Sequence, residues 1–311
     1  MSQISIILPT YNVEKYIARA LESCINQTFK DIEIIVVDDC GSDKSIDIAK
    51  EYASKDDRIK IIHNEENLGT FASRNIGVLN SSSPYIMFLV PDDYLELNAC
   101  EECIYYIKND IDITWFNFLY DENKKITKKN SLFDQILTIK EYCKYIFSMD
   151  LCYWNLCSKL IKKEVYIHAL QKIEDYKKNL TMAEDALICF FIIIHCKKIA
   201  TSSKHIYYYC INQGSSTLCN NIKKIKRYLE DETYIVSTMK AFLKNNNIDK
   251  NLYYFCNILM YDIAYWKNHR KELYIKNTNK ILWKIFFKYI IRTQRKHYMK
   301  KKKTFIKLLN V

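Results

Sequence analysis

The chain has 311 residues, 49% of them hydrophobic, and carries a formal net charge of +11. This length and apolar content can fill a large core, which excludes an intrinsically disordered protein. Only four glycines are present, at positions that form neither a GxGxxG dinucleotide-binding motif nor a GxxxxGK[ST] phosphate-binding loop.

Four apolar runs in the first 90 residues predict strands. Residues 4–8, 32–37 and 85–89 are typical of strands buried on both faces of a parallel sheet, and residues 59–62 predict a fourth strand. Helical periodicity separates them, because apolar residues recur every three or four positions between 17 and 24 and between 46 and 53. The stretch TFASRNIGVL, after the fourth strand, predicts a further helix. The pattern is a βα repeat, in which ligands usually lie beyond the carboxyl ends of the strands.

Polar residues follow three of these strands. Two adjacent carboxylates, Asp92 and Asp93, repel each other and lose hydration on burial, so a divalent cation is a candidate to compensate them. An isolated Pro-Asp-Asp sequence is more typical of a solvated turn that caps a helix, but three strands that end in polar residues favour a site. These residues are Thr10, Tyr11 and Asn12 after the first strand, Asp38 and Asp39 after the second, and Asp92 and Asp93 after the third.

The repeat ends near residue 110. A mixed, tyrosine-rich region follows, and from about residue 222 the pattern is helical and contains neither Pro nor Gly. We therefore expect three parts, 1–110, 111–221 and 222–311. The charge lies mainly in the last part, because residues 267–311 contain 15 Lys and Arg and one acid, so the other 266 residues carry a net charge of 11 − 14 = −3.

The C-terminal pattern also predicts an amphipathic helix. The KKKK at 300–303 adds charge after it. Such a helix can lie on an anionic membrane surface, or it can equally pack its apolar face on the rest of the protein. The cations on one side are Lys280, Lys284, Lys288, Arg292 and Arg295, and the apolar residues on the other are Leu282, Phe286, Tyr289 and Ile290.

Twelve cysteines are scattered along the chain, and only Cys100 and Cys103 form a CxxC pair. Since no second pair follows at zinc-site spacing, we expect reduced thiols in a cytoplasmic protein, packed mostly as small hydrophobic side chains. The first residues, MSQISIILPTYN, do not have the pattern of a signal peptide. The longest apolar run, residues 186–194, is far shorter than the ~20 residues that span a bilayer.

Several segments resemble the family 2 glycosyltransferases with the GT-A fold. The first 100 residues carry SIILPTYNVEKYIARALESCINQTFKDIEIIVVDDCGSDKS, NLGTFASRNIGV and PDDYLE, and the later segments AEDALICF and YYYCINQGSST resemble the acceptor half of that family. The resemblance implies an α/β fold with a mostly parallel central sheet flanked by helices, here with a helical C-terminal extension. Within the family, the chain is similar to Campylobacter-type lipooligosaccharide β-1,3-galactosyltransferases.

The resemblance implies a donor site for a UDP-sugar. Asp39 would accept the imide N–H of uracil, which the matching position of cytosine cannot donate. Arg74 would lie near the diphosphate or the donor sugar, although a surface arginine of a helix has the same sequence pattern. The residues implied in nucleotide-sugar binding are Pro9, Thr10, Tyr11, Asp38, Asp39, Arg74 and Asp92.

The resemblance also implies a metal site and a base. Asp92 and Asp93 match the metal-binding pair and would hold Mn²⁺ or Mg²⁺ against the diphosphate. Many relatives have Asp where this chain has Val90, so either the remaining pair suffices or binding is weakened. Asp185 would take the proton of the acceptor hydroxyl and Glu184 would orient the acceptor, although acids at a helix start are also common as caps.

These features imply an inverting, metal-dependent transferase at the inner face of the cytoplasmic membrane. It would move a hexose, galactose by resemblance, from a UDP-sugar to a lipid-linked glycan. Two alternatives remain open. One is an inactive, membrane-attached subunit that binds a nucleotide sugar, an alternative left open by Val90. The other is a nucleic-acid-binding protein that acts through the basic tail, but the body is net negative and no recognised nucleic-acid module is present, so no nucleic-acid partner is expected.

Overall fold

The computed structural model describes residues 2–129, 132–148, 154–211 and 221–277, and between 291 and 308 it describes 291–294, 296–297, 299–304 and 307–308. The described residues belong to two compact units. The first unit draws on Met1–Thr138, Leu156–Leu180 and His195–Asn212, and the second draws on Ile139–Asn155, Thr181–Ile194 and Gln213–Val311.

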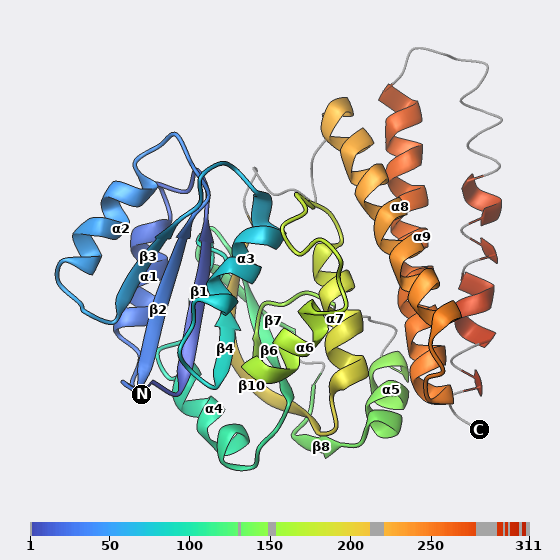
Figure 1. Ribbon diagram of the computed structural model, residues 1–311, viewed down its shortest axis with the longest axis horizontal. Coiled ribbons are helices and arrows are strands. Elements are labelled where there is room, and N and C mark those ends of the chain that lie inside the picture. The colour runs from blue at the N-terminus through green and yellow to red at the C-terminus, as the bar shows by residue number, and fades with distance from the viewer. Residues whose placement is uncertain are drawn as a thin grey trace. The chain divides into compact units, whose positions relative to one another are not determined.

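The predicted βα repeat forms the first part of unit one (Figure 1). Its four strands are parallel and lie in the order β3-β2-β1-β4. Every residue of β1 is buried, which explains why its sequence is apolar except for Ser5 and Thr10. The strands are β1 (Ile4–Thr10), β2 (Ile32–Asp38), β3 (Ile59–His63) and β4 (Tyr85–Phe88), and the helices between them are α1 (Ile17–Ile25), α2 (Ser45–Ala53) and α3 (Gly69–Leu79).

Packing against the sheet explains both the helical periodicity of the sequence and the presence of one glycine. Helix α1 buries the stripe that the sequence predicts, including Ile17, Leu21 and Cys24. A Cβ atom at Gly77 would lie 2.4 Å from Cγ2 of Ile7, so only glycine lets α3 approach β1 this closely.

The remaining strands make the sheet mixed. β10 runs parallel to β6, whereas β9 pairs antiparallel with both β4 and β6, and β5 pairs antiparallel with β10. The full order is β3-β2-β1-β4-β9-β6-β10-β5, with β7 on β6 and β8 on β10. These elements are β5 (Tyr94–Leu95), α4 (Ala99–Lys108), β6 (Ile113–Glu122), β7 (Lys125–Lys129), β8 (Gln135–Leu137), β9 (Lys159–Lys162), α6 (Lys163–Leu170) and β10 (Ile199–Cys210).

The helical C-terminal extension expected from about residue 222 is confirmed by α8 (Ile222–Asn245) and α9 (Lys250–Asn277) of unit two. Unit two also contains α5 (Ile139–Ser148) and most of α7 (Glu184–His195). Two buried ion pairs join its elements: Arg270 of α9 bonds Glu232 of α8, and Lys302 contacts Asp262 of α9 at 2.8 Å.

Much of the amphipathic pattern predicted for the tail falls outside the described residues. No helix in the described part of the chain is both long enough and apolar enough to cross a membrane. The following residues of that pattern lie outside the described part: Lys280, Leu282, Lys284, Phe286, Lys288, Tyr289, Ile290 and Arg295.

The core contains several cysteines, as the sequence predicts. Cys24, Cys100 and Cys103 are free thiols in one hydrophobic cluster with residues of β1, β2 and β4. Burial raises the pKa of the Cys103 thiol, so this CxxC pair has the environment of packed side chains and not of a metal site.

Candidate active site

The carboxyl ends of β1, β2 and β3 lie side by side. The strand register pairs Thr10 with Asp38, and Asp38 with His63. The Asp38 carboxylate lies 2.8 Å from His63 Nδ1 and accepts a hydrogen bond of 3.0 Å from the backbone N–H of Cys40. Tyr11 is 49% exposed, so this edge presents an aromatic ring and a partly accessible carboxylate.

Other residues expected at the donor site are covered. Pro9 and Thr10 are buried at the end of β1, and the Thr10 hydroxyl donates to the carbonyl of Leu8 at 3.0 Å. Only their backbone atoms and their packing can therefore shape the nucleotide site.

Asp39 is also buried, and its carboxylate caps α3. Oδ1 accepts hydrogen bonds of 2.8 Å from the N–H of Leu68 and from the side-chain amide of Asn64, and Oδ2 accepts one of 2.9 Å from the N–H of Gly69. These backbone groups begin the helix, where a negative charge is favourable. Gly69 has a φ of +82°, and a Cβ there would lie 2.4 Å from Oδ1 of Asn179. The geometry thus favours a positioning role for Asp39 more than a contact with uracil.

Asp93 is only 2% exposed and is bound from β10. Its Oδ2 accepts a hydrogen bond of 2.6 Å from the hydroxyl of Tyr207, and its Oδ1 accepts one of 2.7 Å from the N–H of Cys210. Burial, with the charge of Asp92, raises the pKa of Asp93 to about 7. Because a metal ligand must be accessible, and Asp93 is covered and has a donor on each oxygen, this arrangement is unfavourable for a cation at Asp93.

Asp92 is the more accessible carboxylate of the pair, and its turn is held in place. The guanidinium of Arg19 donates to the backbone carbonyl of Asp92 at 2.7 Å and lies 4.6 Å from the ring centroid of Tyr94. The ring of Tyr94 stacks on Tyr208 at 4.3 Å, and its hydroxyl donates to Asp121 at 2.9 Å. Helix α1 and strands β5, β6 and β10 therefore all contribute to fixing this turn.

A metal at this edge would depend on its substrate for ligands. Within the described ranges, no group of three His, Cys, Asp or Glu side chains has the geometry to hold an ion. Val90 supplies only its N–H, which donates to the Tyr207 hydroxyl at 3.2 Å. One carboxylate with phosphate oxygens is nevertheless a common set of ligands for Mg²⁺, so Asp92 fits an ion bound together with a diphosphate.

Arg74 is not a surface arginine. Its side chain, on α3, is 4% exposed, and its guanidinium carbon lies 5.9 Å from the ring centroid of Phe88 on β4. The sequence was compatible both with a donor-site arginine and with a surface arginine. The structure places the guanidinium in the interior, between α3 and the end of β4.

Glu184 and Asp185 begin α7 in unit two, and both are half-buried. The turn before them is anchored to α8, because the N–H and the hydroxyl of Thr181 each donate to Asp231 at 3.0 Å. Ala183 has a φ of +61°, an uncommon conformation for a residue with a Cβ. The start of α7 is therefore specified by contacts from another helix.

Sequence reasoning missed Arg19, Tyr207 and Asp231. Arg19 lies on the polar side of an amphipathic helix, and the contact of Tyr207 with Asp93 spans 114 residues. No local pattern identifies such residues, although the tyrosines of β10 lie in a segment that resembles the family.

Comparison with known proteins gives a consistent result. The family model described as Glycosyl transferase family 2 matches residues 5–160. EpsH of Bacillus subtilis, a putative glycosyltransferase, is 30% identical over 249 residues, which cover 78% of this chain and 70% of EpsH. The minor teichoic acid biosynthesis protein GgaB of B. subtilis is 30% identical over 279 residues, which cover 86% of this chain but only 29% of GgaB.

The fold has a solved counterpart. S. aureus TarS, crystallised as residues 1–349 in complex with UDP-GlcNAc, superposes with a TM-score of 0.64 at 19% identity and covers 97% of this chain and 91% of the TarS chain. The α/β fold predicted from the sequence, with its central sheet, flanking helices and C-terminal helices, is confirmed.

Proposed function

Because this chain belongs to glycosyltransferase family 2, we propose that it is an inverting, metal-dependent hexosyltransferase that uses a UDP-sugar. One observation carries the proposal: the accessible carboxylate of Asp92 follows β4 at the same sheet edge as Tyr11 and Asp38, which follow or end the neighbouring parallel strands. Ligands of such sheets usually lie at this edge.

Residues of unit one would bind the donor. The exposed ring of Tyr11 can stack on the uracil base, and the half-buried carboxylate of Asp38 can accept hydrogen bonds from the base or ribose. Asp39 would act through α3, whose start it caps and which carries Arg74. Asp92 would hold Mn²⁺ or Mg²⁺, which when bound neutralises charge that develops on the leaving diphosphate.

Residues at the start of α7 would act on the acceptor. Asp185 would take the proton of the attacking hydroxyl, and Glu184 would orient the acceptor. A single displacement inverts the configuration at the anomeric carbon. In this proposal residues 1–110 bind the nucleotide sugar, 111–221 bind the acceptor, and 222–311 form the helical region with the membrane-associating tail.

For the acceptor we propose a lipid-linked cell-surface glycan, extended at the inner face of the cytoplasmic membrane. Support comes from the name of GgaB, which refers to teichoic acid biosynthesis. Transfer of galactose in a β-1,3 linkage to a lipooligosaccharide is the most specific form of this proposal and rests on sequence resemblance alone.

A donor screen tests the proposal directly. The purified protein is incubated with UDP-galactose, UDP-glucose or UDP-GlcNAc, with glycan acceptors, and with Mn²⁺ or EDTA, while UDP release is measured. Acceptor-dependent release with one donor, abolished by EDTA and restored by Mn²⁺, is expected. Full activity in EDTA would contradict the metal assignment.

The second candidate is an inactive nucleotide-sugar-binding subunit, and it is favoured by Val90, whose side chain cannot ligate a metal. Calorimetric binding of UDP without acceptor-dependent release for any donor would support this candidate over the enzyme.

A further inference from the structure

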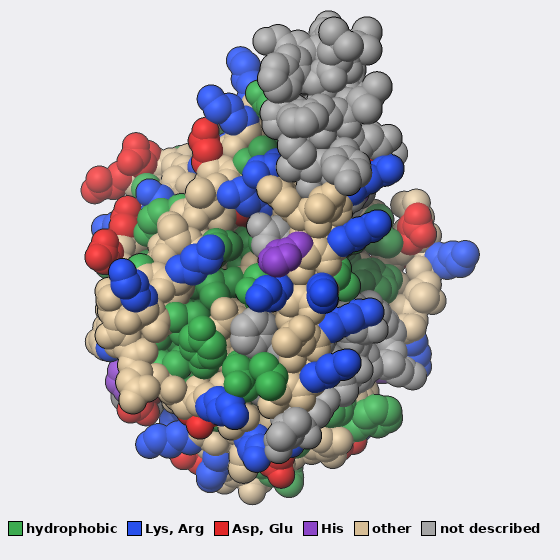
Figure 2. All heavy atoms as spheres, turned by 90° about the vertical axis from the view of Figure 1, so that its right-hand side faces the viewer, with side chains coloured by type: hydrophobic (Ala, Val, Ile, Leu, Met, Phe, Trp, Pro, Cys, Tyr) green, Lys and Arg blue, Asp and Glu red, His purple; other side chains and the backbone are tan. Residues whose placement is uncertain are grey.

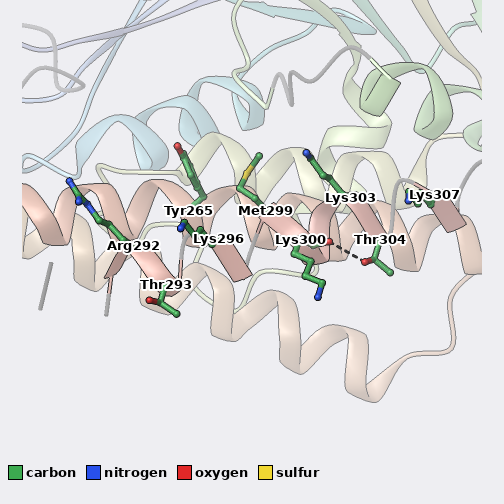
Figure 3. Close-up of a pocket in the computed structure, with 9 residues that line it drawn as sticks. All are labelled: Tyr265, Arg292, Thr293, Lys296, Met299, Lys300, Lys303, Thr304 and Lys307. Atoms are coloured by element: carbon green, nitrogen blue, oxygen red, sulfur yellow. Dashed lines mark hydrogen bonds between the residues drawn. The ribbon is translucent and has the colours of Figure 1, made fainter. Parts of the chain in front are cut away.

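A cavity of about 940 Å³ lies along the described residues near the C-terminus. Five cations line it, and Figure 3 shows them with Tyr265 of α9 and with Met299. No acidic side chain is among the described residues that line the cavity. We call the five cations the basic stripe: Arg292, Lys296, Lys300, Lys303 and Lys307.

The basic stripe lies on the exposed side of its helical segments. Its members are four, four, three and four residues apart, which is the spacing of one face of an α-helix. The buried residues Ile291 and Lys302 are eleven apart and share a different face, on which Lys302 pairs with Asp262 of α9. One face is thus anchored to α9 through Lys302 and Asp262, while the other presents cations to solvent.

The charge of the basic stripe is not compensated within the described part of the chain. No ion pair joins any of its five members to a described Asp or Glu. Figure 2 shows Lys and Arg side chains spread over the face in view and acidic ones mainly near its edges. Uncompensated cations in one cavity attract an external anion.

The size of the cavity and its apolar lining indicate which anion. Five cations line a cavity of about 940 Å³, which exceeds the size of a single phosphate group. Met299, an exposed large apolar side chain, lines the same cavity, and so does the ring of Tyr265 on α9. Cations beside exposed aliphatic and aromatic groups are typical of surfaces that bind lipid headgroups.

We infer that the basic stripe binds the anionic headgroups of a membrane leaflet. The inference rests on the proposed function in one respect: a membrane contact would bring the enzyme close to a lipid-linked acceptor. The sequence suggested that all four lysines of the KKKK run would contribute to membrane binding. Lys302 does not belong to this surface, because it is buried and paired with Asp262.

The test compares two triple variants of the full chain. Lys296→Gln/Lys300→Gln/Lys303→Gln removes three charges from the basic stripe. Lys50→Gln/Lys108→Gln/Lys172→Gln removes three exposed charges from α2, α4 and the turn after α6, and so serves as the control for net charge. Each protein is sedimented at low salt with phosphatidylcholine vesicles and with vesicles that contain phosphatidylglycerol.

We expect the wild type to sediment only with the anionic vesicles. The partition coefficient of the stripe variant on anionic vesicles should fall by on the order of 10²-fold relative to the wild type. The partition coefficient of the control variant should fall much less. Equal losses in both variants, or a wild type that ignores anionic vesicles, would overturn the inference. Stripe-dependent binding to a random DNA duplex without vesicle binding would assign the surface to nucleic acid instead.

Calorimetry of UDP binding in Mn²⁺ separates this inference from the proposed function. Unchanged UDP affinity in the stripe variant is expected. If acceptor-dependent transfer fails for all proteins while the vesicle result holds, the proposed enzyme is wrong and the lipid surface remains.

Discussion

Asp92 and Asp93 are neighbours in the sequence, but burial gives them different chemistry. Asp93 has a hydrogen-bond donor on each oxygen and a pKa raised to about 7, chiefly by burial, whereas Asp92 remains partly accessible. The sequence shows only the repeated Asp, because both donors to Asp93 come from β10, more than 110 residues later. Which carboxylate can bind a cation is therefore decided by tertiary contacts.

The pair can be separated by replacing each carboxylate with its amide. Asp92→Asn should lower transfer by on the order of 10²-fold or more and remove the Mn²⁺ dependence of UDP binding, because the ligand charge is lost. Asp93→Asn should keep both the transfer rate and the Mn²⁺ dependence of UDP binding. The amide oxygen can still accept from the N–H of Cys210, and the amide can still hydrogen-bond to the hydroxyl of Tyr207. UDP calorimetry with and without Mn²⁺ measures the difference, and a folded Asp93→Asn protein without the metal effect would reverse the assignment.

The proposed base gives a second prediction for single residues. Asp185→Asn should leave UDP binding almost unchanged and lower kcat by roughly 10²–10⁴, the range for a lost general base. Glu184→Gln, next to it on α7, should mainly raise the KM for the acceptor. If Asp185→Asn transfers sugar at the normal rate, the base lies elsewhere.

At the scale of elements, hydrophobic periodicity predicts the strands and helices whose own sequence determines which side is buried. The first four strands and α1 to α3 follow from runs of buried residues and from the 3.6-residue stripe, because each element buries its own apolar side. β6 and β10 were not predicted. β10 changes register against β6 near His205 and alternates irregularly, so its pattern is neither that of a half-exposed strand nor that of a helix.

Glu33 of β2 connects three neighbouring elements, and this gives a prediction for acid. Although burial alone would raise its pKa, hydrogen bonds from Lys60, Ser5 and Ser82 lower the pKa of Glu33 to about 2. Since the folded pKa lies below the ordinary value of 4.5, the stabilisation is complete above pH 4.5 and is lost as the pH falls toward 2, at no more than about 1.4 kcal/mol per pH unit.

Urea denaturation of the wild type and of Glu33→Gln between pH 7 and pH 3 checks this. The variant should be less stable at pH 7, and the gap in unfolding free energy should narrow below about pH 4.5. A gap that stays constant down to pH 3 would mean that folding does not lower the pKa of Glu33.

The contact between α8 and the turn before α7 predicts an effect of Asp231 on catalysis at a distance. Asp231→Ala releases both hydrogen bonds from Thr181 and so loosens the turn that leads to Asp185. We expect a decrease in kcat of about 10- to 100-fold with donor KM unchanged, because small misplacements of a reacting group are costly. Asp231→Asn, which keeps an acceptor oxygen, should recover part of the rate. A lower melting temperature with normal kcat would limit Asp231 to a structural role.

At the scale of the whole molecule, residues near the C-terminus are part of a folded unit. The sequence left open whether the basic tail lies on a membrane surface or packs its apolar face on the rest of the protein, and it does not distinguish one lysine from another. The structure separates Lys302, which is buried against Asp262, from Lys301, which is exposed. Lys302 is buried because its helical segment packs against α9 beside Asp262. The local sequence pattern around a lysine does not reveal such a contact between distant segments.

The two lysines form a matched pair for a stability measurement. Lys302→Ala removes the cation beside the buried carboxylate of Asp262 and should lower the unfolding free energy by about 3–5 kcal/mol. Lys301→Ala should change it by no more than about 0.5 kcal/mol. Equal midpoints in urea for the two variants would show that Lys302 does not hold this segment on α9.

The bonds from Tyr207 and Cys210 to Asp93 also set an order of events during synthesis. Chains emerge from the ribosome with the N-terminus first, and contacts between distant residues form late. The sheet edge that carries Tyr11 and Asp38 can therefore assemble from the first 90 residues, whereas the turn at Asp92 lacks its support until Cys210 has been added. A nascent chain would thus have the nucleotide edge of its site well before it could hold a metal there.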